Sequence, residues 1–161
     1  TSLLIIIKMK VKTQWAVKKK LDRFCKHVLD YESLGDVDLV ILTDRGSEFL
    51  NPEFIETNHD TDKKLFSLFY CDPMCSHQKG KVENAHTLIR RFIPKGTSIK
   101  NTTQEDCIKM MNNINSFKRE RLNWSTPYES FRLLYNTFLL YKYRLRNISA
   151  RKVSLDKSIF K

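Results

Sequence analysis

Short apolar runs alternate with longer amphipathic stretches in the N-terminal half of the chain. Residues 2–9 and 37–42 are short and rich in Ile, Leu and Val, which is typical of buried strands. Between them, over residues 13–29, apolar side chains recur at helical spacing, and we interpret the lysines of this stretch as a solvated face. The alternation predicts an α/β domain, in which helices cover a sheet.

The alternation continues along the rest of the chain. We expect a third strand over residues 65–70 and further helices over residues 51–56, 81–92, about 102–117 and about 126–143. Two capping signals support the last two helices. Thr102 is followed by Glu105, and Thr126 is followed by Pro127 and Glu129. The helix over 102–117 has an inward stripe of Ile108, Met111, Ile114 and Phe117.

The predicted helix over residues 81–92 carries two stripes of side chains. Its apolar stripe, which we expect to pack on the sheet, consists of Val82, Ala85, Ile89 and Phe92. Glu83 and Arg90 lie two turns apart on another stripe. Taken alone, this second stripe is typical of a solvated face with paired charges.

The chain has 161 residues, about the length of one domain. Its longest purely apolar run, residues 3–7, is far shorter than the roughly 20 residues of a bilayer-spanning helix, and no secretory segment precedes it. Because the first residue is Thr1 rather than Met, we expect an internal piece of a longer protein. Residues after Asn147 have weak periodicity, and we expect a flexible basic arm there.

The positive charge lies in the second half of the chain. Residues 1–80 hold 12 basic and 12 acidic side chains, whereas residues 81–161 hold 17 basic and 6 acidic ones. Lys and Arg that neutralise phosphates release counterions and gain affinity. The charge therefore favours nucleic acid as a partner, with acidic membrane lipid as the competing interpretation.

The four cysteines lack the tight spacing of a disulfide framework, and we interpret them as reduced. Cys71, Cys75 and His77 could supply three soft ligands to zinc, with His86 or Cys107 as a fourth. Their spacing is not that of a usual zinc knuckle. A zinc-stabilised binding module is therefore kept as a third alternative.

Two carboxylates lie where a metal site is expected. Asp44 follows the predicted strand of residues 37–42, and ligands gather at the carboxyl ends of strands in open α/β sheets. Glu83 lies on the predicted helix over 81–92. Carboxylate oxygens bind divalent cations, and two such cations about 4 Å apart promote phosphoryl transfer. The spacing alone does not single out this pair, because any domain has Asp and Glu pairs.

The sequence around these carboxylates resembles the catalytic core of DDE transposases and retroviral-type integrases, and most closely the bacterial insertion-sequence family numbered thirty. The resemblance covers about residues 3–134. It is carried by Thr43-Asp44-Arg45-Gly46-Ser47-Glu48-Phe49, Asp72-Pro73, Gly80-Lys81-Val82-Glu83-Asn84, Leu88-Ile89-Arg90-Arg91-Phe92-Ile93-Pro94-Lys95-Gly96-Thr97 and Arg119-x-Arg121-Leu122-x-Trp124-x-Thr126-Pro127-Tyr128-Glu129-x-Phe131.

The resemblance implies a ribonuclease-H-like α/β fold, a mixed sheet flanked by helices, that cuts and joins DNA with Mg²⁺ or Mn²⁺. Asp44 matches the second acid and Glu83 the third acid of the family's Asp-Asp-Glu triad, so both are expected catalytic residues and metal ligands. The implied domains are an integrase-type core over residues 1–134, and the end of a C-terminal helix with a basic tail over residues 135–161.

The resemblance also implies partners. The residues expected to meet DNA are Lys81, Asn84, Arg90, Arg91 and Lys95. Gly46 fits a tight turn where the absence of a Cβ lets the backbone and a phosphate approach closely. The implied partners are transposon ends, target DNA and further copies of the chain, with no membrane, in the bacterial cytoplasm at the nucleoid.

The sequence departs from the family in two places. The family's first Asp lies on the first strand of its sheet, but residues 2–11 contain no acid, so we expect the first one or two strands and the first metal ligand to be absent. Arg45 stands where the family more often has a small polar residue. Two alternatives follow: an active transposase core that cleaves and transfers DNA strands, or an inert truncated remnant that only binds DNA through its basic second half.

Overall fold

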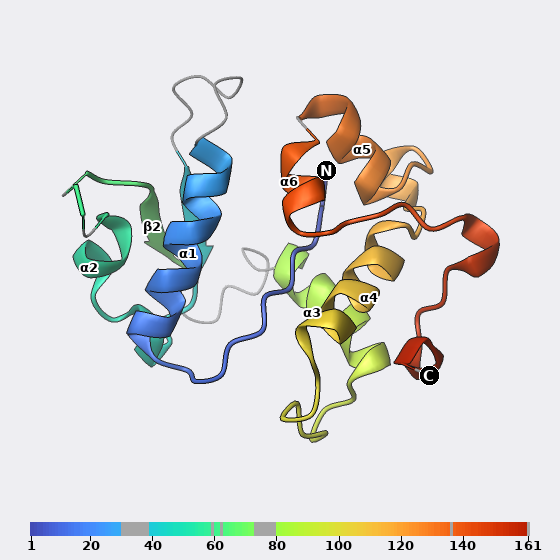
Figure 1. Cartoon of the computed structure of the whole chain (residues 1–161), viewed down its shortest axis with the longest axis horizontal. Coiled ribbons are helices and arrows are strands. Elements are labelled where there is room, and N and C mark those ends of the chain that lie inside the picture. The colour runs from blue at the N-terminus through green and yellow to red at the C-terminus, as the bar shows by residue number, and fades with distance from the viewer. Residues whose placement is uncertain (30–38, 59, 62, 73–79, 136, 161) are drawn as a thin grey trace. The chain divides into compact units, whose positions relative to one another are not determined.

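The computed structural model describes residues 1–29, 39–58, 60–61, 63–72, 80–135 and 137–160 (Figure 1). The chain forms two compact units. Unit 1 comprises Thr1–Lys8 and Gly80–Lys161, and unit 2 comprises Met9–Lys79. The units contain mostly helices together with a small parallel sheet, which agrees with the predicted α/β class.

Unit 2 is built on a parallel pair of strands. Its elements are α1 (Gln14–Leu29), β1 (Val40–Thr43), a 3-10 helix (Ser47–Phe49), α2 (Pro52–Glu56) and β2 (Ser67–Tyr70). Val40 lies opposite Ser67, and Thr43 lies opposite Tyr70. Both predicted strands and both predicted helices of this region are confirmed, with shifted ends. Residues 37 and 38 of the strand predicted over residues 37–42 lie outside the described residues.

One face of this sheet is covered and the other is open. Helix α1 lies across the covered face (Figure 1), where Cys25 packs in one cluster with Ile55, Phe66 and Leu68. On the other face, Val40, Leu42 and Phe69 are 61%, 48% and 54% exposed. Strands that are apolar on both faces are typical of sheets with helices on both sides. Among the described residues of unit 2, no element covers the open face of this sheet.

The prediction of a solvated lysine face on α1 is wrong for Lys18. Its side chain is buried and forms an ion pair with Asp22 at 3.2 Å. Its ammonium group also donates to the Thr57 carbonyl and lies 5.5 Å from the centre of the Phe54 ring. The periodicity places Lys18 on the helix, but only the packing of α2 against α1 encloses it.

Unit 1 is organised around helix α4. Its elements are α3 (Gly80–Phe92), α4 (Gln104–Asn115), α5 (Pro127–Leu134), α6 (Phe138–Lys142) and the 3-10 helices Glu120–Leu122, Ala150–Lys152 and Lys157–Phe160. One cluster joins α4 to Phe92 of α3, and a second joins it to Leu140 of α6. Of the predicted apolar stripe of α3, Ile89 and Phe92 pack in the cluster with α4, whereas Val82 is 47% exposed. The sheet belongs to unit 2, so packing of this stripe on the sheet stays a prediction. Phe117, predicted on the inward stripe of α4, is instead 45% exposed beyond the end of that helix.

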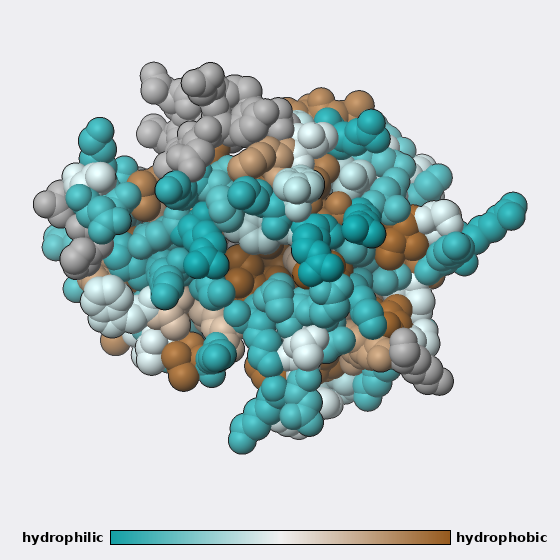
Figure 2. Space-filling model, viewed as in Figure 1, coloured by the Kyte–Doolittle hydropathy of each residue, from teal (hydrophilic) through white to brown (hydrophobic). Residues whose placement is uncertain are grey.

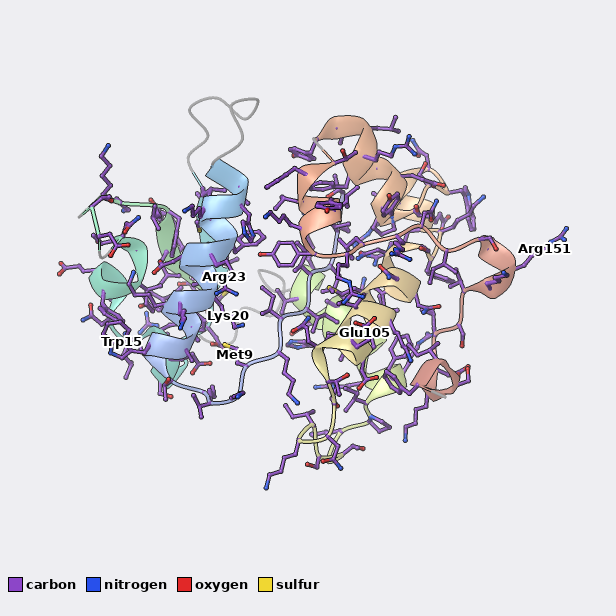
Figure 3. The ribbon with its side chains drawn as sticks, viewed as in Figure 1. Met9, Trp15, Lys20, Arg23, Glu105 and Arg151 are labelled. Atoms are coloured by element: carbon purple, nitrogen blue, oxygen red, sulfur yellow. The ribbon has the colours of Figure 1, made fainter. Side chains whose placement is uncertain are left out.

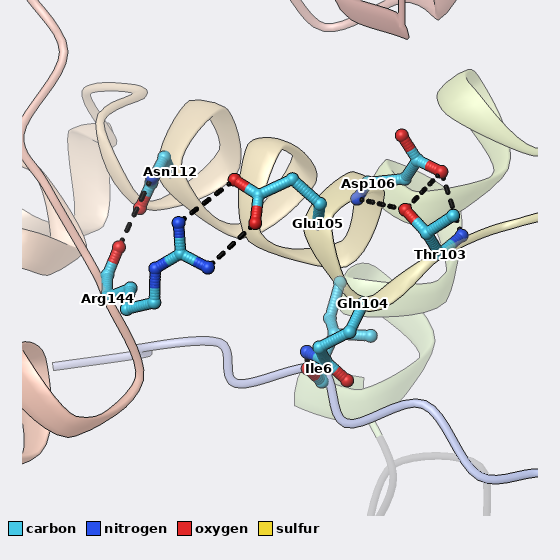
Figure 4. Close-up of polar contacts among 7 residues, drawn as sticks. All are labelled: Ile6, Thr103, Gln104, Glu105, Asp106, Asn112 and Arg144. Carbon is cyan, nitrogen blue, oxygen red and sulfur yellow. Dashed lines mark hydrogen bonds and ion pairs between the residues drawn. The ribbon is translucent and has the colours of Figure 1, made fainter.

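Residues 2–9 do not form the predicted strand. They run as an extended segment, and the part in unit 1 lies along α4, whose side chains take the place of a neighbouring strand. Asn115 accepts the N–H of Leu4 and donates to its carbonyl, both at 2.8 Å. Gln104 accepts the N–H of Lys8 at 2.9 Å. It also donates to the carbonyl of Ile6 at 3.3 Å, and Figure 4 draws Gln104 next to Ile6.

The capping box of α4 lies one residue later than predicted. The Thr103 hydroxyl accepts the N–H of Asp106 at 3.1 Å, and the Asp106 carboxylate accepts the N–H of Thr103 at 2.8 Å (Figure 4). The Thr103 N–H and the Thr103 hydroxyl both donate to the Asp106 carboxylate, and these two bonds lower the pKa of Asp106. Glu105, the predicted partner, instead pairs with Arg144 at 2.7 Å. Thr followed three residues later by an acid occurs in both registers, so the sequence pattern could not choose between them.

The C-terminal region differs from its prediction. The helix expected over residues 126–143 is split into α5 and α6, because the backbone of Tyr135 is extended (φ −135°, ψ 167°). The tail is not a free arm over its described residues, since Leu155, Ile159 and Phe160 pack into the cluster around Phe92. The predicted Thr126, Pro127 and Glu129 signal is confirmed.

No helix in the described parts of the chain is long and apolar enough to cross a membrane. Hydrophilic residues cover most of the face that Figure 2 shows.

We predict that Asn115→Ala lowers the free energy of unfolding of unit 1 by about 2–4 kcal/mol, because it leaves the N–H and carbonyl of Leu4 unpaired and opens a cavity. Gln104→Ala, which removes two exposed hydrogen bonds to the same segment, should cost less than about 1 kcal/mol. Urea denaturation followed by circular dichroism measures both. Equal losses of the free energy of unfolding in the two variants would show that the Asn115 hydrogen bonds stabilise unit 1 no more than those of Gln104.

Candidate functional site

Asp44 lies at the carboxyl edge of the sheet, as the sequence predicts. It directly follows β1, is exposed, and its Oδ1 accepts the N–H of Gly46 at 3.2 Å. The ladder continues past the strand, because the N–H of Cys71 donates to the Thr43 carbonyl at 2.9 Å. The edge on which Asp44 stands is therefore the ordered end of a parallel pair, where ligands of open α/β sheets collect.

Asp72 is a candidate that the sequence analysis did not assign to the site. It is exposed and lies two residues beyond the end of β2. Because β1 and β2 are parallel, both end at the same edge, which places Asp72 on the edge of Asp44. The signal in the sequence was an acid directly after a strand-like run, the same signal that pointed to Asp44.

Gly46 makes a tight turn, but the backbone does not require glycine there. Its φ of −62° is open to any residue, and its carbonyl accepts the N–H of Phe49 at 2.9 Å. A Cβ at this position would lie 2.7 Å from Oε2 of Glu48, whose carboxylate pairs with Lys12 at 3.1 Å. Within the described chain, the missing Cβ therefore makes room for Glu48. The predicted approach of a phosphate stays a prediction.

Helix α3 carries the other predicted site residues. Glu83 is exposed in its first turn, and among the described residues its carboxylate has no ion pair or hydrogen bond. The predicted DNA-contacting residues are all exposed in the same unit, on α3 or just after it: Lys81, Asn84, Arg90, Arg91 and Lys95. These residues therefore lie along the same helix as Glu83 or directly after it, and their contact with DNA stays a prediction. Asp44 belongs to unit 2, so a metal site shared by Asp44 and Glu83 stays a prediction.

The donor set suits a hard divalent cation. Asp44, Asp72 and Glu83 offer carboxylate oxygens, the ligands that Mg²⁺ and Mn²⁺ prefer. Among the residues that the structure describes, no three His, Cys, Asp or Glu side chains gather as potential metal ligands. Asp44 and Asp72 lie on one sheet edge, and a metal site at that edge stays a prediction.

The zinc alternative gains no support from the described cysteines. Cys75 and His77 lie outside the described residues. Cys71 is buried in unit 2, whereas Cys107 is buried in the core of unit 1 beside Phe92. Cys25, Cys71 and Cys107 are free thiols, as predicted, and burial raises the pKa of the Cys25 thiol to about 11.

The sequence is similar to transposases of bacterial insertion sequences. The transposase for insertion sequence element IS4351 of Bacteroides fragilis is 33% identical over 96 residues, which are 60% of this chain and 28% of that protein. The transposase InsI for insertion sequence element IS30A of Escherichia coli K12 is 33% identical over 86 residues, which are 53% of this chain and 21% of that protein. The resemblance to insertion-sequence transposases of this type is confirmed.

A viral protein gives the longest of these matches. ORF3 of Spiroplasma virus SpV1-R8A2 B, an integrase by its name, is 25% identical over 137 residues, which are 81% of this chain and 41% of that protein. The chain thus spans less than half the length of the relatives it matches. No protein-family model matches the chain, and no solved structure matches it.

We predict that Gly46→Ala displaces Glu48, breaks its ion pair with Lys12 and lowers the free energy of unfolding by about 0.5–1 kcal/mol. Gly80→Ala is the matched control, because a Cβ at this helical position meets nothing within 4 Å. That variant should leave the stability unchanged or raise it. Thermal melts of both variants test the difference, and a Gly46→Ala variant as stable as the parent chain would count against the close contact with Glu48.

Proposed function

We propose that this chain is part of the catalytic domain of a DNA transposase, with a ribonuclease-H-like fold, and that it takes part in metal-dependent cleavage and transfer of DNA strands. The similarity to insertion-sequence transposases carries the proposal. The position of Asp44 at the carboxyl edge of a parallel strand pair is in keeping with it. DNA ends and target DNA are the proposed substrates, bound by several copies of the chain.

Asp44 and Glu83 would hold Mg²⁺ or Mn²⁺, with Asp72 as a further oxygen donor beside Asp44. When bound, such a metal supplies activation of the attacking oxygen and stabilisation of the leaving one. The chain's own part is to orient the ligands. The Gly46 N–H fixes one oxygen of Asp44, and the first turn of α3 presents Glu83 to solvent.

The cations of α3 would hold the DNA backbone. Arg90 and Arg91 lie in its last turn and Lys95 follows it, and all three are exposed. The net charge of +11 is carried by residues 81–161, which belong to unit 1. Phosphate contacts of this kind fix the position of DNA without reading its sequence.

Binding of DNA without cleavage is the second candidate. Residues 2–9 contain no acid and lie along α4 rather than in the sheet, so they supply no third carboxylate to the edge of Asp44. In this alternative the basic surface of unit 1 binds DNA, and Asp44 and Glu83 hold no metal.

We predict that the chain binds Mg²⁺ or Mn²⁺ in calorimetry and that Asp44→Asn and Glu83→Gln each weaken binding and DNA strand transfer by about a hundredfold or more. Loss of an outer-shell partner alone costs about 10- to 100-fold, and loss of a direct ligand should exceed that. Asp60→Asn, an exposed carboxylate of unit 2, is the control. A folded parent chain that binds neither metal would reject catalysis and leave the second candidate.

We predict that Arg90→Gln, Arg91→Gln and Lys95→Gln each lower the affinity for DNA of any sequence. Each should also reduce the slope of log affinity against log salt concentration by about one. Fluorescence anisotropy of a labelled duplex at several salt concentrations gives both quantities. Arg23→Gln on α1 (Figure 3) removes an exposed arginine of unit 2 and should change neither. An unchanged slope in all three variants would argue against these contacts.

A further inference from the structure

A groove with a volume of about 460 Å³ lies in unit 1 between residues 3–7 and helix α3. The apolar lining comes from the extended segment on one side and from Val82, Ala85 and Ile89 of α3 on the other. The polar lining among the described residues consists of Ser2 and four basic side chains: Lys81, His86, Arg119 and Arg121. No described carboxylate lines the groove, so none of the side chains that the structure places there opposes its positive charge.

Arg119 is the unusual member of this lining. Its side chain is half-buried, and its Nε is buried without a hydrogen-bond partner among the described residues. No ion pair of the described chain involves Arg119 or Arg121, and each carries a charge that repels the other. Burial lowers the pKa of the Arg119 guanidinium, and the charge of Arg121 lowers it further. An anion between the two would relieve both costs.

The loop that carries both arginines is firmly fixed. The N–H of Arg119 donates to the Ser125 carbonyl at 3.2 Å, and the N–H of Trp124 donates back to the Arg119 carbonyl at 3.1 Å. Asn123 and Trp124 both have left-handed backbones, with φ of 51° and 60°, which costs energy in residues other than glycine. Such a conformation persists only where its surroundings enforce it, and strain of this kind gathers at binding sites.

Two anchors hold the loop in place. After it, the Thr126 hydroxyl accepts the N–H of Glu129 at 3.1 Å, while the Glu129 carboxylate accepts the N–H of Thr126 at 2.9 Å. This bond lowers the pKa of Glu129, which keeps the carboxylate charged. The second anchor lies in the lining of the groove, where Arg121 donates to the Ser2 hydroxyl at 2.9 Å. The arginine pair is thus positioned before any ligand arrives.

We propose that this groove binds a phosphodiester of a DNA strand, with Arg119 and Arg121 as its donors and Lys81 as a third cation. The guanidinium fork matches the geometry of phosphate oxygens and binds them in pairs. The apolar wall of residues 3–7 would contact the sugar of the same nucleotide. The inference rests on the proposed function for the identity of the polyanion, and it adds a site that is distinct from the outward cations at the end of α3.

The test is DNA binding by the full chain in buffer with a chelator, so that the result does not depend on metal binding. The probes are a fluorescein-labelled duplex and a labelled single strand of the same sequence. Arg119→Gln and Arg121→Gln should each weaken binding of at least one probe about tenfold and reduce its salt slope by about one. Arg119→Lys should keep the slope and lose part of the affinity, because it retains the charge without the fork.

Arg151→Gln is the matched control, because this exposed arginine projects into solvent from the C-terminal region of the same unit (Figure 3). It should bind both probes like the parent chain. Since Arg119 is half-buried, circular dichroism melts establish that each variant is folded. Arg121 is exposed, so Arg121→Gln tests the groove even where Arg119→Gln unfolds the chain.

The outcomes separate the two proposals. The groove proposal alone would be overturned by one result. In that result the parent chain binds DNA, and the folded Arg121→Gln and Arg119→Lys variants bind both probes with unchanged affinity and salt slope. A parent chain that does not transfer DNA strands or does not bind Mg²⁺ would overturn the proposed catalysis. If the arginine variants still weaken DNA binding as expected, the groove proposal is unaffected. A folded parent chain that binds neither probe would overturn both.

Discussion

Asparagine side chains of α4 hold both ends of unit 1 in place. Asn115 pairs with the backbone of Leu4, Asn112 accepts the N–H of Arg146 at 2.9 Å, and Asn113 accepts the N–H of Ser154 at 2.9 Å. These bonds satisfy backbone groups of segments that form neither helix nor strand, and an unpaired buried backbone group is costly. The groove, the arginine loop and the packed tail all depend on this helix.

The candidate functional residues lie in both units of the chain. Asp44 and Asp72 stand on the sheet edge of unit 2, while Glu83, the cations of α3 and the arginine pair belong to unit 1. In unit 1 the phosphate-binding candidates are of two kinds. Arg90, Arg91 and Lys95 are solvated and suit contacts that position DNA by charge. Arg119 is half-buried, and its Nε has no hydrogen-bond partner in the described part of the chain, which suits a ligand that enters the groove.

Local signals predicted the elements that local chemistry stabilises. The spacing of apolar residues identified α1 and α3, and Thr126 with Pro127 and Glu129 identified the start of α5, because helix periodicity and capping depend on neighbours in the sequence. The prediction for residues 2–9 was wrong, although their composition is that of a strand. Composition cannot say whether a strand partner or the side chains of a helix will satisfy the backbone.

The sequence by itself determined α1, α3, α4 and the start of α5, the basic second half, the carboxylates after each strand and the resemblance to transposases, since all of these are properties of neighbouring residues. Tertiary structure alone decided that Lys18 is enclosed, that Glu105 pairs with Arg144 and that the tail packs beside Phe92. It also decided that Arg119 stands in a groove that none of the described carboxylates lines. Burial and pairing depend on residues far apart in the chain, and one sequence does not reveal which of them meet.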